Sequence, residues 1–245
     1  MKFVVRIVAT IALLAGGLVL GRLLFDNYGL NKQIAQLEAE LGRMPIGDTG
    51  RVHLVEIEAP DVPPEVAQHL ERIWQFRCYL PPGYDVLCCS GGGRVAKQGV
   101  MLDGGTSTGW NSPRSEATHR LFTVSFQKKG ERLEAFSRFG ASSGTHGWNR
   151  LEPANLDAPV VVETIVNSVQ GTRSFDQNMI LPVLKIYDPR SAEEKSLAGK
   201  ATATYAGGLF VLCPKSRGSA FVRLLRGETP QGYQASWVAS PAGDE

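Results

Sequence analysis

The amino-acid sequence predicts a mainly β protein, in which an N-terminal transmembrane α-helix precedes a β-sandwich or jelly-roll-like soluble domain. Three observations predict this class. An uncharged apolar run lies near the N-terminus, about ten short segments of period-two alternation follow it, and 27 glycines and 14 prolines interrupt the chain. The alternation of strand and helix that is typical of parallel α/β sheets is missing.

The first predicted element is the apolar run at residues 3–25, in which residues 7–21 carry no charge. As a helix, a run of this length covers a hydrocarbon core of about 30 Å, and Arg6 and Arg22 can reach the headgroups at its ends. A cleaved signal peptide is the alternative. Because no Ala-x-Ala site follows the run, we favour an uncleaved single-pass anchor. The flanking charges are nearly balanced, and we expect the soluble domain to lie outside the cytoplasm.

The sequence divides into three predicted parts: an anchor at residues 1–25, a juxtamembrane helix and linker at residues 26–50, and a β-rich soluble domain at residues 51–245. Gly17 and Gly21 have the spacing that lets two helices approach closely in lipid, so a homodimer through the N-terminal helix is one expected assembly. An apolar stripe of coiled-coil spacing follows the anchor. It consists of Leu30, Ile34, Leu37 and Leu41.

The clearest strand predictions come from alternating residues. Residues 73–80 alternate, residues 81–83 (Pro-Pro-Gly) predict a turn, and residues 84–89 are expected to return as the partner strand. Residues 119–126 and 132–139 predict a hairpin. The other expected strands are residues 52–58, 98–102, 160–166, 179–187, 209–213, 220–225 and 233–238.

The intervening segments predict loops and two short helices. Residues 140–159 are rich in Gly, Ser and Asn, and we expect a long loop there. Residues 61–72 predict one short helix. Ser191 and Glu194 have the spacing of a capping box, which predicts a second helix that Gly199 ends.

The composition limits the classes of function. An apolar fraction of 43% and a charged fraction of 20% are ordinary for a folded domain, and a net charge of +2 argues against a nucleic-acid partner. The four cysteines are Cys78, Cys88, Cys89 and Cys213, and the sequence leaves open whether any of them form a disulfide. Because no C-x-x-C pair exists and the four histidines are scattered, we expect no metal site.

Two glycine motifs could suggest enzymes. Residues 105–109 match G-x-S-x-G around Ser107, but a nucleophile elbow needs a strand that turns into a helix, and Pro113 follows too closely for one. The triad would need a downstream Glu and His146. Residues 91–96 match G-x-G-x-x-A, yet no helix is expected after them, so we interpret these glycines as a tight turn or a β-bulge.

The remaining candidate is the polar loop at residues 142–148, which together with Trp110 could form a recognition surface. We favour the alternative, in which Trp110 and Trp148 cap the core and His146 is an exposed loop residue. No catalytic, cofactor-binding or metal-binding residue is therefore assigned. The sequence predicts a membrane-anchored structural or interaction module with an unidentified protein or glycan partner. A membrane-tethered hydrolase that uses Ser107 is the alternative.

Overall fold

The computed structural model describes residues 44–58, 72–129, 132–140, 142–147, 160–197 and 200–241, together with Arg6, Gly16, Gly17, Leu20, Gly21 and Arg22. The contacts divide the chain into two units, Met1–Pro45 and Ile46–Glu245. In the first unit the described residues 6, 16, 17 and 20–22 are helical. No helix within the described part of the chain is both long enough and apolar enough to cross a bilayer. The rest of the predicted anchor, the apolar stripe and residues 61–71 of the helix expected at residues 61–72 lie outside the described residues, and Arg72 begins a strand.

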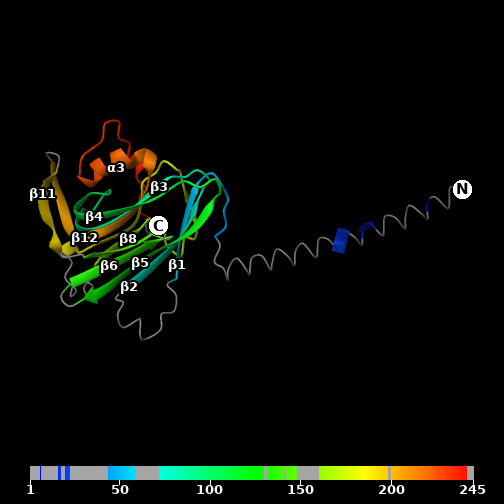
Figure 1. Ribbon diagram of the computed structural model, residues 1–245, viewed down its shortest axis with the longest axis horizontal. Helices are drawn as coiled ribbons and strands as arrows, with labels where there is room; N and C mark the ends of the chain where they lie inside the picture. The colour runs from blue at the N-terminus through cyan, green and yellow to red at the C-terminus, as the bar shows by residue number, and fades with distance from the viewer. Residues whose placement is uncertain are drawn as a thin grey trace. The chain divides into compact units, whose positions relative to one another are not determined.

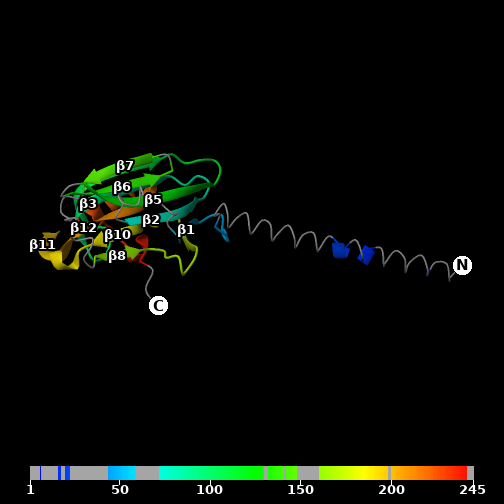
Figure 2. The same cartoon turned by 90° about the horizontal axis from the view of Figure 1, so that it is seen from below.

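The second unit is a sandwich of two antiparallel six-stranded sheets, which are seen as two layers in Figure 2. Sheet A has the order β7-β6-β5-β2-β1-β9, and sheet B has the order β4-β3-β12-β10-β8 with β11 paired to β12. Figure 1 shows α3 (Gly218–Leu225) on the side of β3, β4 and β12, away from β5 and β6. The predicted β-sandwich is therefore confirmed. The strands of sheet A are β1 (Val52–Ile57), β2 (Arg72–Leu80), β5 (Thr118–Lys129), β6 (Arg132–Phe139), β7 (Ser142–Gly147) and β9 (Arg173–Phe175). Those of sheet B are β3 (Val86–Ala96), β4 (Leu102–Asn111), β8 (Val161–Thr164), β10 (Leu181–Tyr187), β11 (Glu193–Leu197) and β12 (Lys200–Pro214).

The main core fills the space between the two sheets. Alternation along β2 and β5 points Phe76 and Phe122 inward, where their rings stack at a centroid distance of 5.9 Å. From the facing sheet, Phe210 of β12 meets Phe122 at 6.0 Å, and all three rings are fully buried. Aromatic contacts across the interior therefore join the two sheets.

A second core lies on the other face of sheet B, so the centre of this sheet is buried on both sides. Leu209 and Val211 of β12 point away from the main core and pack with Phe221 of α3 (Gly218–Leu225). The strand β10 is buried along its whole length. Three short 3₁₀ helices complete the described elements: η2 (Pro189–Ser191), η3 (Lys215–Arg217) and η4 (Ala235–Trp237).

Most strands with one buried face match the sequence predictions. The expected strand at residues 73–80 is β2, the expected strand at residues 132–139 is β6, and β5 pairs with β6 as the predicted hairpin. The strands expected at residues 52–58, 160–166, 179–187 and 209–213 also form, with shifted ends.

The predicted pairing of β2 with β3 is wrong. The segment between them, residues 81–85, carries the chain from sheet A to sheet B instead of forming a hairpin. Gly83 supplies a turn with φ +73° in this connection. As a result, β2 pairs with β1 and β5, whereas β3 pairs with β4 and β12.

Three predictions in the last third of the chain are also wrong. The strand expected at residues 220–225 is the helix α3, because Phe221, Leu224 and Leu225 lie on one helical face that covers sheet B. The strand expected at residues 233–238 contains η4. The helix expected after Ser191 is the strand β11, which pairs with the first half of β12.

Three segments in the middle of the chain differ from the structure predicted for them. The glycines at residues 91–93 lie inside β3 instead of forming a turn or a bulge, and they pair with residues 104–106 of β4. The strand expected at residues 98–102 is a turn that leads into β4. The loop expected at residues 140–159 contains β7, while residues 148–159 lie outside the described part.

Candidate functional site

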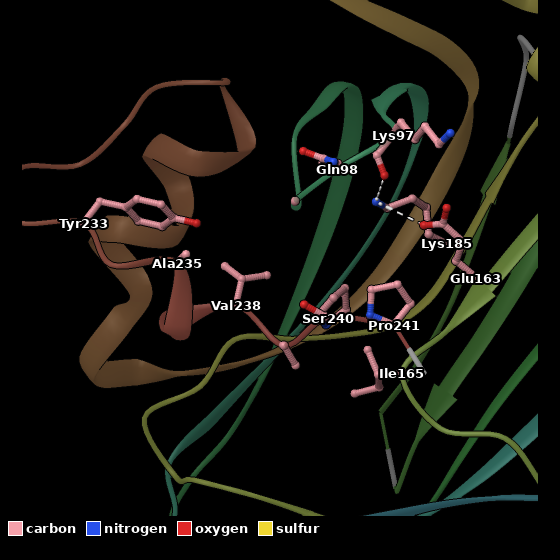
Figure 3. A pocket seen from close by; sticks show the side chains of 13 residues that line it. Lys97, Gln98, Glu163, Ile165, Lys185, Tyr233, Ala235, Val238, Ser240 and Pro241 are labelled. Atoms are coloured by element: carbon pink, nitrogen blue, oxygen red, sulfur yellow. Dashed lines mark hydrogen bonds and ion pairs between the residues drawn. The ribbon is translucent and has the colours of Figure 1, made fainter. Parts of the chain in front are cut away.

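A crevice of about 480 Å³ lies on the outer face of sheet B, where α3 and its neighbours leave that face uncovered. Three parts of the chain border it: the turn at residues 97–99 between β3 and β4, the paired strands β8 and β10, and the segment at residues 233–241 that follows α3. Figure 3 shows Tyr233, Ala235 and Val238 on one side of the crevice and Lys97, Lys185 and Glu163 on the other. Three distant parts of the sequence thus form one site.

The C-terminal segment is fixed to the sheet by backbone hydrogen bonds. The Ile180 amide donates to the Trp237 carbonyl at 2.6 Å, and the Ala239 amide donates to the Ile180 carbonyl at 3.0 Å. Val238 therefore forms an isolated parallel bridge with Ile180, just before β10 begins. Beyond this bridge, Ser240 and Pro241 continue the border of the crevice.

Lys185 is the central residue of the site. It lies in β10 with only 5% of its surface exposed, and its ammonium group reaches into the crevice (Figure 3). The Nζ atom donates a 2.9 Å hydrogen bond to the Lys97 carbonyl and lies 3.6 Å from Oε2 of Glu163. Burial lowers the pKa of Lys185, and the neighbouring carboxylate of Glu163 opposes this effect. A buried charge at the border of a cavity is a common property of functional sites.

Strand register places Glu163 beside Lys185. The two residues are direct cross-strand partners on β8 and β10, so their side chains extend from the same face of sheet B. The other carboxylate oxygen of Glu163 accepts a 3.1 Å hydrogen bond from the Tyr187 hydroxyl. Burial and then the charge of Glu163 raise the pKa of Tyr187 to about 12, so this hydroxyl stays protonated as a donor at neutral pH. Tyr187 thereby fixes the carboxylate next to the amine.

The rest of the crevice combines apolar surface with a few polar groups. Ile165, Pro182 and Val238 form apolar wall, and Tyr233 lies across the crevice from Lys185 (Figure 3). The Tyr233 ring is held edge-on against Trp237 at 5.7 Å, and the Arg217 guanidinium lies 3.9 Å over the same indole. An apolar pocket with a small number of polar groups is typical of a ligand site.

None of the residues singled out from the sequence belongs to this site. The sequence does contain an indication of the site. Lys185 is the one charged residue in the otherwise apolar segment 179–187, and Glu163 is the one charged residue in segment 160–166. A lysine at a position that alternation assigns to a buried strand requires a partner. Only the pairing of β8 with β10 shows that these two charges meet.

Ser107 lies in the middle of β4 as an exposed strand residue and pairs with Ser90 of β3. It borders a small cavity of about 120 Å³ together with Cys88 and Ser137. The nucleophile elbow requires a serine at a sharp turn from a strand into a helix, and β4 continues past Ser107 to Asn111. That requirement is therefore not met at Ser107.

The predicted recognition surface is described only in part. Trp110 is 53% exposed, so the prediction that it caps the core is wrong. Its indole donates to the Asp85 carboxylate, and the Lys215 ammonium lies 3.7 Å above the ring. His146 belongs to β7, but its side chain and the whole of Trp148 lie outside the described residues.

The four cysteines are free thiols. Cys78 of sheet A faces the main core, whereas Cys89 and Cys213 of sheet B face the second core. Cys88, the residue before Cys89 on β3, packs against the main core, as alternation along a strand requires. Burial raises the pKa of Cys88 and Cys213 to about 12 and that of Cys89 to about 11, which keeps these sulfurs protonated and weakly nucleophilic at neutral pH. Within the described ranges, no three His, Cys, Asp or Glu side chains are grouped as a metal ion would need.

Comparison with known proteins gives no relative: no family model, no curated protein and no solved structure matches this chain.

Proposed function

We propose that this protein is a membrane-anchored interaction module and that the crevice on sheet B is where its β-sandwich binds a partner. The observation that carries the proposal is the buried ammonium group of Lys185, which is held by Glu163 and the Lys97 carbonyl at a cavity large enough for a ligand. The uncharged run at residues 7–21 supports the anchor, and we place the sandwich outside the cytoplasm. Binding suits this site better than catalysis, because Glu163 is held by Tyr187 and Lys185, while Lys185 keeps hydrogen-bonding capacity for a ligand.

The anchor is tested by extraction with alkaline carbonate. We expect the wild-type chain to stay in the membrane fraction and to keep its first residues. Changing Leu13 and Leu14 to arginine should release it, since each charge in the middle of an apolar helix costs about 3 kcal/mol on insertion. The matched control changes Leu37 and Leu41 to arginine and should remain membrane-bound. A mature chain that begins near Leu18 or Arg22 would show instead that the run is a cleaved signal.

The crevice is tested by photo-crosslinking of the full chain in intact membranes. We expect p-benzoylphenylalanine in place of Gln98, an exposed residue that borders the crevice, to give an adduct. Ala235→Trp should remove the adduct, because Ala235 borders the crevice and an indole there would fill it. Ser236→Trp is the control, since Ser236 is also exposed but does not border the crevice.

The comparison position is Val169, a residue with 94% exposure that does not border the crevice. The same adducts from Val169, or equal loss in Ala235→Trp and Ser236→Trp, would contradict the proposal.

A further inference from the structure

The charged groups that face the crevice are the ammonium group of Lys185 and the carboxylate of Glu163, which lie 3.6 Å apart. Lys97 meets Lys185 through its backbone carbonyl, and its exposed ammonium group points away from the crevice (Figure 3). Glu163 is also held by the Tyr187 hydroxyl. A negatively charged group on a ligand would therefore bind Lys185 in competition with Glu163.

Lys185 also has hydrogen-bonding capacity to spare. An ammonium group has three N–H donors, and the Lys97 carbonyl takes one of them at 2.9 Å. Glu163 lies at 3.6 Å, which is within reach of an ion pair but beyond the usual length of a hydrogen bond. Figure 3 shows the Nζ atom on the side of Lys185 that faces Tyr233 across the crevice. An acceptor in the crevice can thus approach this amine directly.

The size and the walls of the crevice restrict the rest of the ligand. A volume of about 480 Å³ fits a small molecule or the end of a chain. Ile165, Pro182 and Val238 offer apolar surface beside the amine. A short alkyl or aliphatic side chain would bury its surface there.

From these three features we propose that the crevice binds a monocarboxylate with a short apolar chain. The carboxylate takes an N–H of Lys185, and the apolar chain lies against Ile165, Pro182 and Val238. This inference rests on the proposed function and names the ligand chemistry of the same site.

Glu163 has a defined part in this scheme. Its carboxylate competes with the ligand for the charge of Lys185, and the Tyr187 hydroxyl, bound to it at 3.1 Å, keeps it in place. Removing the charge of Glu163 should leave Lys185 fully available to the ligand. Glu163→Gln should therefore increase the affinity for a carboxylate, whereas a merely structural ion pair would give no such gain.

The experiment is isothermal titration calorimetry of the full chain in detergent micelles with hexanoate, and with hexanamide as the neutral probe of equal shape. We expect hexanoate to bind roughly tenfold more tightly than hexanamide, and Glu163→Gln to widen this ratio. Ala235→Trp should abolish binding of both probes, and Ser236→Trp should change neither. Micelles alone serve as the blank.

Removal of the amine completes the test. Lys185→Met should lose the preference for hexanoate. Because this variant leaves the half-buried Glu163 without its ion-pair partner, Lys185→Met combined with Glu163→Gln is the version expected to fold well, and it too should bind the two probes equally.

Equal binding of the two probes by the wild type, or weaker hexanoate binding in Glu163→Gln, would overturn the carboxylate proposal. The proposed function would still stand if Ala235→Trp removed the Gln98 adduct. Loss of that crosslinking difference would contradict the proposed function itself.

Discussion

Replacing Phe210 with alanine should lower the free energy of unfolding by about 3–5 kcal/mol, the range for deleting a large buried ring. Phe210 is fully buried in β12 and meets Phe122 of the facing sheet at 6.0 Å. The change removes aromatic contacts and leaves a cavity between the sheets that neighbours on two rigid strands cannot close. Chemical denaturation of the full chain, followed by circular dichroism, measures the loss.

The matched control for this substitution is Leu121→Ala. Leu121 is next to Phe122 on β5 but points to the outer face, where it is 43% exposed. Its truncation removes little buried surface and should cost less than about 1 kcal/mol. Equal losses in the two variants would show that the space between the sheets is not the main source of stability.

Gly93→Ala should destabilise the sandwich by about 2–3 kcal/mol, because it forces an extra methyl group into a closely packed strand pair. Gly93 lies directly opposite Gly104, and an added Cβ would strike the Asp103 carbonyl and lie 2.7 Å from the Cα of Gly104. Both obstacles are backbone atoms, so only a separation of β3 and β4 would relieve them. Thermal denaturation should show a lower Tm than that of the wild type, and hydrogen exchange should show faster exchange of the β4 amides.

Gly105→Ala is the control for this strand pair. Gly105 lies one residue beyond Gly104 on β4, and a Cβ there would meet no atom within 4 Å. The substitution should therefore leave stability nearly unchanged or slightly improved. If both glycine variants lost the same stability, the close approach of β3 and β4 would not explain the effect at Gly93.

The sequence predicts those strands that have one buried face and one exposed face. In β2 and β6, large apolar residues alternate with polar ones, and this period of two identifies both strands almost to the residue. The segment around Phe221 has no such pattern, because its short apolar run gives no period that distinguishes a strand from a helix. It forms the helix α3, in which Phe221, Leu224 and Leu225 pack together onto the second core.

The turn or bulge predicted at residues 91–93 is wrong for a related reason. A run of glycines usually indicates a turn, but in β3 the small residues let β4 approach closely at Gly93. The same local pattern can serve either purpose, and the choice depends on a neighbour that the local sequence does not specify.

The candidate site could not be predicted from local sequence because it depends on pairing. Lys185 and Glu163 are separated by a turn, a loop and the strand β9, and the carbonyl that Lys185 binds belongs to Lys97 in another hairpin. The sequence shows only that Lys185 is an isolated lysine in an apolar strand. That Glu163 is its partner follows only from the register of β8 with β10.

The place of β12 in sheet B has a consequence for biosynthesis. Its central partner β3 is made early, yet Ala96 pairs with Thr204, more than 100 residues later. Contacts between such distant residues close large loops, which slows folding. Until β12 leaves the ribosome, β3 and β10 lack the strand between them, and the inner face of sheet A has no complete partner. We therefore expect the sandwich to form late, after nearly the whole chain has been synthesised, with its aromatic interior exposed to chaperones until then.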